Sequence, residues 1–286
     1  MIPEAIAIGD SVLGAATHAS KALGWIRRRR MRRLLGTLSN PSLPVNLYLR
    51  EMDQKSGKFT AREPHKSPSL PDWQTIHHYQ NIPEVYGLHD VKAAILILNL
   101  LSQSGKGTQV VCRSPRDEWN QWSSADVVSI GGHDVTWRIL ERFSPRVVEY
   151  IPNETFRVGN QSFVARLPCD YGLICRGFDP LSNRTFLVVV GIGGLGTEAA
   201  ARFLFTRAGL LARLFPRTGF SILVRASWND HAQLVQPVWS WPEPTGPTVH
   251  NRRCWTEWNT LRKTEIPCYP LAGPSASTAA WPIPMI

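Results

Sequence analysis

The chain lacks the residue groupings that usually hold a metal ion. Its 286 residues include five cysteines, with no C-x-x-C pair and no Cys/His grouping at zinc spacing. The pairs His77-His78 and Asp230-His231 have no third ligand spaced nearby. The sequence therefore predicts no metal site.

Several motifs that mark known chemistry are also absent. The sequence contains no G-x-S-x-G, no H-E-x-x-H and no Walker lysine. The stretch Gly105-Lys106-Gly107-Thr108 lacks the upstream glycine of a P-loop and precedes an expected strand instead of a helix. None of the reaction classes that these motifs mark is predicted.

Long apolar runs are missing as well. No uninterrupted stretch of about 18 apolar residues occurs, so a membrane-spanning helix is not predicted. Residues 5–26 come closest, but Asp10, His18 and Lys21 interrupt them. Basic residues follow this stretch, whereas in a secretory signal peptide they precede the apolar part.

The five cysteines form an odd set without recognisable spacing. Cys112 and Cys175 fall in expected strands, where free cysteines usually act as small buried apolar residues. Reduced thiols would fit a cytosolic protein. The sequence thus predicts a cytoplasmic location.

Acidic residues are fewer than basic ones, which gives a formal net charge of +10. One short segment supplies much of this excess, through Arg27, Arg28, Arg29, Arg30, Arg32 and Arg33. Without it the chain is only mildly basic, so the overall charge does not favour nucleic-acid binding.

Residues 1–40 are expected to form a basic amphipathic helix. One interpretation places it on an anionic membrane, with the arginines of residues 27–33 against the lipid and the protein peripheral to the membrane. The other is a soluble helix whose basic end is solvated. The sequence leaves both open.

Residues 44–241 predict an α/β domain, because expected strands alternate with expected helices. The sheet should be largely parallel, with an antiparallel portion around residues 147–186 and a hairpin at Gly159-Asn160. Expected strands cover residues 45–50, 108–113, 126–130, 147–151, 172–176, 185–190, 220–226 and 234–239; helices cover 2–38, 90–101, 135–143 and 197–215. Residues 242–286, rich in Trp and Pro, are expected to be an irregular tail.

The most informative pattern lies at residues 184–202. An apolar, β-branched run meets Gly191, Gly193 and Gly196 at G-x-G-x-x-G spacing, and a helix of small residues follows. A strand that turns into a helix through glycines presents unpaired backbone N–H groups at the positive end of the helix dipole. This predicts a phosphate site formed by Gly191, Gly193, Gly194, Gly196 and Thr197.

A second glycine turn follows the strand at residues 126–130, at Gly131 and Gly132. If the two strands are parallel neighbours, both turns lie at the carboxyl edge of the sheet, where α/β proteins bind ligands. The alternative is structural, because glycines at such turns also let a helix pack tightly against the sheet.

Three further residues are candidates for this crevice. His133 and Asp170 are candidate proton carriers, since each is expected at the same edge. Arg225 lies near the end of the strand after the glycine turn, where a basic residue could suit the 2′-phosphate of NADP. A packed or solvated role is the alternative for each.

Residues 189–200 resemble the nucleotide-binding turn of dinucleotide-binding (Rossmann) domains and that of ubiquitin-activating-type adenylating enzymes. A longer stretch, roughly residues 108–226, resembles an α/β module found near the C-terminus of archaeal S-layer proteins and in uncharacterised bacterial proteins. That pattern pairs residues 126–132 with residues 190–200, and places residues 170–174 between them. The expected Asn after the Gly-Gly pair is absent. The resemblance implies a Rossmann-like fold more than an activity.

The leading functional prediction is a module of an intracellular sensor or signalling system that binds a nucleotide, NAD(P) among them, or another small phosphorylated ligand. An NAD(P)-linked or nucleotide-modifying enzyme is one alternative. A structural or interaction domain whose first helix touches a membrane is the other.

Overall fold

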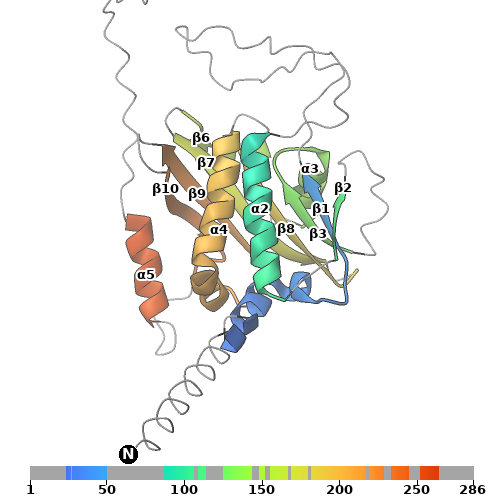
Figure 1. Cartoon of the computed structure of the whole chain (residues 1–286). Helices are drawn as coiled ribbons and strands as arrows, with labels where there is room; N and C mark the ends of the chain where they lie inside the picture. The colour runs from blue at the N-terminus through green and yellow to red at the C-terminus, as the bar shows by residue number, and fades with distance from the viewer. Residues whose placement is uncertain are drawn as a thin grey trace, which may run out of the picture.

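A computed structural model of the chain shows an α/β fold built on a mixed seven-stranded sheet (Figure 1). It describes residues 24–26, 28–49, 87–105, 109–113, 125–143, 148–151, 155–166, 169–179, 182–216, 219–228, 233–244 and 252–263. Residues 1–23, His77, His78, Asp230 and His231 lie outside the described residues.

The sheet has the strand order β10-β9-β7-β8-β3-β1-β2. Four neighbouring strands are parallel, namely β2 (Val110–Arg113), β1 (Val45–Leu49), β3 (Asp126–Ile130) and β8 (Arg184–Gly191). The other three continue the sheet in antiparallel pairs, namely β7 (Cys169–Asp179), β9 (Phe220–Trp228) and β10 (Gln233–Trp241). The antiparallel part therefore reaches further along the chain than residues 147–186.

Helices cover both faces of the sheet. α2 (Leu88–Gln103) and α4 (Gly194–Leu214) pack side by side on one face, and α5 (Arg252–Lys263) lies beside α4 (Figure 1). On the other face lie α3 (Asp134–Phe143) and a separate three-stranded sheet of β4 (Glu149–Ile151), β5 (Thr155–Val158) and β6 (Gln161–Val164).

The side chains of β8 alternate between two hydrophobic cores, one on each face of the sheet. Leu187 and Val189 belong to the core under α2 and α4, whereas Val188 and Val190 belong to the core under α3. Successive side chains of a strand point to opposite faces, so a continuous apolar run is what a strand covered on both sides requires.

Two details of the sequence-based prediction are wrong. The tail is not irregular throughout, because α5 forms between Pro247 and Pro267, and its Cys254 and Trp258 are buried one helical turn apart. Cys112 is exposed, because β2 is an edge strand, while Cys175 is buried as expected.

The thiols are not all reduced. Cys112, Cys175 and Cys254 are free, but Cys169 is disulfide-bonded. The thiol argument for a cytoplasmic location therefore loses its basis, and that location stays a prediction. Among the helices of the described residues, none is both long enough and apolar enough to cross a membrane.

Candidate functional site

The glycine turn joins β8 to α4 as predicted, and its glycines are needed for close backbone packing. A Cβ on Gly196 would lie 2.1 Å from the carbonyl oxygen of Tyr171, and one on Gly172 would lie 2.0 Å from the carbonyl oxygen of Gly196. A Cβ on Gly191 would lie 2.3 Å from the Thr197 nitrogen. The first turn of α4 thus rests directly on the backbone of β7, which favours the structural interpretation of these glycines.

The expectation that the amides of this turn are unbonded is wrong. Oδ2 of Asp170 accepts a hydrogen bond from the Gly196 N–H at 2.6 Å, and Oδ1 accepts one from the Gly193 N–H at 3.2 Å. Oδ1 also accepts the Tyr171 N–H at 2.7 Å. A carboxylate of the chain therefore occupies the position at the α4 N-terminus that the sequence assigns to a phosphate.

Opposing effects act on this carboxyl group. Burial raises the pKa of Asp170 above its usual range, while the N–H groups of Gly196, Tyr171 and Gly193 and the nearby charge of His89 act in the opposite direction. Because its oxygens are bonded to these backbone groups, Asp170 is placed as a cap for α4 and not as a proton carrier open to a ligand.

Thr197 is also used internally. Its hydroxyl oxygen accepts the Gly191 N–H at 2.9 Å, and its side chain is buried. Arg225, on β9, is paired with Tyr171 across the strands, and its Nη2 lies 3.8 Å from the sulfur of Cys169.

The second glycine turn does lie beside the first, because β3 and β8 are parallel neighbours. Tyr150 lies between them: its hydroxyl donates to the Gly191 carbonyl at 3.3 Å and would be 2.5 Å from a Cβ on Gly132. Stacking against Trp137 and Phe156 fixes the tyrosine ring. The two glycine turns are thus brought together, but a side chain of the chain fills the space at their contact.

His133 points toward buried polar groups at the start of α3. Its Nε2 lies 3.2 Å from Oγ of Ser129, which also contacts Thr136 at 2.8 Å. Thr136 in turn donates to the Gly131 carbonyl. The arrangement fixes the turn after β3, which is the structural role that the sequence left open for His133.

A cluster that the sequence analysis missed lies between α2 and α4, and we call it the Glu198 cluster. Glu198 is only 2% exposed, yet three basic side chains reach its carboxylate. They are His89 at 2.8 Å, Arg202 at 2.8 Å and Lys92 at 3.6 Å. Local spacing places His89 with Lys92 on one face of α2 and Glu198 with Arg202 on one face of α4, but no local signal links the two helices.

The Glu198 cluster borders the glycine turn. A Cβ on Gly194 would lie 3.1 Å from Cβ and Cδ2 of His89, so the imidazole rests on the first residue of α4. Desolvation raises the pKa of Glu198, but the hydrogen bonds from His89 and Arg202 and the charge of Lys92 outweigh it. The net effect is a pKa below the usual value, which keeps Glu198 ionised at neutral pH.

The opposite end of the sheet carries the basic segment. Residues 28–35 are helical and bury Met31, Leu34 and Leu35 against the body. Arg28, Arg29, Arg30, Arg32 and Arg33 are exposed on the same helix. The following 3-10 turn (Gly36–Ser39) is held by Thr37, whose hydroxyl contacts Asp126 at the start of β3.

A buried arginine fixes this helix to the sheet. Nη1 of Arg176, on β7, donates to the carbonyl oxygens of Arg33, at 3.1 Å, and Leu34, and its guanidinium lies over the ring of Phe220. Burial lowers the pKa of Arg176 to about 10, so it stays positively charged at neutral pH. A cation at the last carbonyls of a helix is favourable.

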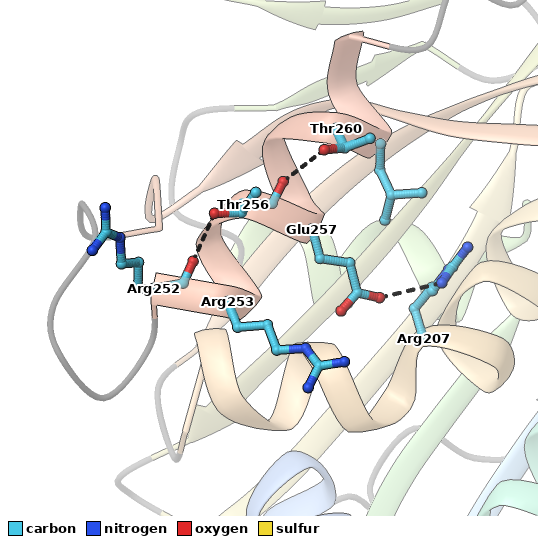
Figure 2. Close-up of a pocket in the computed structure, with 7 residues that line it drawn as sticks. Arg207, Arg252, Arg253, Thr256, Glu257 and Thr260 are labelled. Carbon is cyan, nitrogen blue, oxygen red and sulfur yellow. Dashed lines mark hydrogen bonds and ion pairs between the residues drawn. The ribbon is translucent and has the colours of Figure 1, made fainter.

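Arginines line at least two surface hollows among the described residues. One, of about 260 Å³, is formed by Trp25, Arg28, Arg29 and Arg32. The other, of about 820 Å³, lies between α4 and α5, where Arg207 pairs with Glu257 at 3.3 Å and Arg253 extends beside them (Figure 2). Neither hollow includes a residue of the two glycine turns.

No protein-family model and no curated protein matches this chain. The resemblances noted from the sequence therefore stay predictions. In the part of the chain that the structure describes, no three His, Cys, Asp or Glu side chains are grouped so that they could hold a metal ion.

Proposed function

We propose that this protein contacts an anionic membrane surface through the helical residues 24–26 and 28–35. The observation that carries the proposal is the combination of five exposed arginines in residues 28–33 with exposed apolar side chains in the helical residues 24–26. Trp25 is 60% exposed and Ile26 is 37% exposed. Arg29 lies over the Trp25 ring, 5.3 Å from its centre.

The energetic basis is electrostatic, with an added apolar term. Each Arg or Lys near an anionic bilayer contributes about 1 kcal/mol, and the effect falls off within the screening length of the salt. Tryptophan prefers the interface between lipid headgroups and hydrocarbon. Its presence beside the arginines favours a lipid surface over a nucleic acid, because basic residues alone would serve either partner.

Vesicle flotation tests the proposal. The full chain should float with vesicles that contain phosphatidylserine and stay behind with phosphatidylcholine vesicles, and added salt should weaken the binding. Replacing Arg28, Arg29 and Arg32 by Gln should abolish flotation. A matched triple variant, with Gln at Arg207, Arg252 and Arg253, removes the same charge from the other basic hollow and should float like the wild type.

Two results would contradict the membrane proposal. One is flotation that both triple variants lose equally, which would indicate a response to net charge alone. The other is a wild type that binds duplex DNA but no anionic vesicle.

We propose the binding of a small phosphorylated ligand, with a Rossmann-like sheet as its scaffold, as a second function. It is supported by the gathering of His89, Lys92 and Arg202 beside the glycine turn, and not by the turn's amides, which Asp170 uses. Thermal shift against AMP, ATP, NAD and NADP tests it, and absence of stabilisation by all four would exclude nucleotides as the ligand. The enzyme alternative would need turnover of NAD or ATP that is lost in His133→Gln.

A further inference from the structure

The Glu198 cluster contains more positive than negative groups. Three basic side chains converge on one carboxylate, and two of them, His89 and Lys92, reach the same oxygen, Oε2. Arg202 reaches the other oxygen, Oε1. Lys92 and Arg202 are both cations, so the single carboxylate of Glu198 compensates only one of the two charges that it brings together.

The basic groups also keep unused donors. Lysine has three N–H groups, arginine has five and a protonated histidine has two. Within the described part of the chain, the side chains of His89, Lys92 and Arg202 are bonded only to Glu198. Their further donors are available to a group that approaches from solvent.

Access is open on the outer side. Glu198 is buried, but the side chains of His89, Lys92 and Arg202 are 40%, 44% and 48% exposed. Glu198 thus holds them from beneath, and their outer faces line the surface between α2 and α4. The helix spacing keeps them in place, because His89 and Lys92 share one face of α2 while Glu198 and Arg202 share one face of α4.

We infer that His89, Lys92 and Arg202 form a binding site for an oxyanion, the phosphate group of a small ligand, with Glu198 as the residue that positions them. The inference rests on the second proposal above and gives it a location that the glycine turn cannot provide. A phosphate supplies the missing negative charge and accepts several N–H bonds at once. Nδ1 of His89 faces Glu198, so Nε2 is the ring nitrogen left for the ligand, and it donates to an oxyanion only when the imidazole is protonated.

Calorimetric titration of the full chain with inorganic phosphate and with AMP tests the site. Lys92→Met keeps the aliphatic stem and removes one charge-assisted bond, so it should weaken binding by about tenfold or more. Arg207→Met is the matched control. Arg207 also lies on α4, but its ion-pair partner is the half-exposed Glu257 of α5 and not Glu198. It should bind within about twofold of the wild type.

The outcomes separate this inference from the proposal on which it rests. A wild type that binds phosphate or AMP, with Lys92→Met and Arg207→Met both unchanged, overturns the site and leaves ligand binding standing. A wild type that binds neither probe overturns the site, and one that also shows no response to the nucleotide panel overturns the second proposal too. In NMR spectra of the wild type, the imidazole resonances of His89 should shift when phosphate is added, while those of His133 should not. A shift at His133 without one at His89 also overturns the site.

Discussion

The two ends of the central sheet use their polar groups in opposite ways. At the carboxyl end, where α4 begins, the amides of Gly193 and Gly196 are bonded to Asp170, and Tyr150 fills the space between the glycine turns. At the amino end, the arginines of residues 28–33 are exposed, and Arg176 bonds the backbone carbonyl of the last of them, Arg33. A glycine turn with the spacing of a ligand site can thus have its amides bonded to a side chain of the same chain, while an arginine-rich helix keeps its side chains exposed to a partner.

At the carboxyl end of the sheet, we expect the largest loss of stability from a substitution at Gly172. Gly172→Ala places a methyl group 2.0 Å from the Gly196 carbonyl oxygen, which is backbone and cannot move without displacing α4. We expect a loss of more than about 3 kcal/mol in the free energy of unfolding, measured by urea denaturation. Gly209→Ala, with nothing within 4 Å, should instead stabilise α4 by up to about 1 kcal/mol. Similar stabilities for both variants would contradict the close packing.

The attachment of the basic helix can be broken at Arg176. Arg176→Met leaves the partly buried carbonyl of Arg33 and the buried carbonyl of Leu34 without their donor, at a cost of about 2 kcal/mol. Hydrogen exchange should increase across residues 28–35. The control is Arg213→Met, since Arg213 also donates to a backbone carbonyl, that of Gly209, but at an exposed position. It should change stability by less than about 0.5 kcal/mol, and an equal loss would argue against a special role for Arg176.

Removing the Asp170 side chain would leave the amides at the start of α4 without their acceptor, which makes the two ends of the sheet more alike. Asp170→Ala removes the acceptor for the Gly193 and Gly196 amides and should destabilise the fold by about 1–2 kcal/mol. Those amides can then bind an anion, so phosphate should raise the melting temperature of the variant more than that of the wild type. Equal phosphate responses would mean that the amides do not become available.

The smallest effect is expected at Glu198, and it depends on pH. Glu198→Gln should cost about 1 kcal/mol at pH 7, because the basic partners are half-exposed. Since the folded-state pKa of Glu198 is lowered, its contribution is present above the unfolded value and is lost as pH falls through the folded value. The stability difference between variant and wild type, measured by urea unfolding, should therefore shrink below about pH 4.5. A constant difference down to pH 2 would contradict the lowered pKa.

Local patterns predicted much of this fold. Strands β1 and β3, the hairpin of β5 and β6, and the two strand–glycine–helix units follow from apolar runs and turn residues next to them in sequence. The full length of β7 was not predicted, because Gly172 and Gly177 interrupt its apolar pattern. Their lack of a side chain leaves room for the α4 backbone and for the Phe186 ring, respectively. Helix α5 was missed since the surrounding prolines dominated the composition.

The site was harder to predict for a physical reason. Asp170 precedes Gly196 by 26 residues, and His89 precedes Glu198 by 109, so neither contact has a local signature. The glycine spacing showed correctly where a helix begins against a sheet. It could not show which side chain from another strand would meet the helix N-terminus.

Because Thr37 and Arg176 attach the basic helix at the amino end of the strands, its direction is rigidly coupled to that of the sheet. A surface engaged by Trp25 and the arginines would therefore orient the whole domain. The Glu198 cluster, at the far end of the strands, would then face away from that surface toward bulk water. The two partners proposed for this chain would not compete for space, and both could be bound at once.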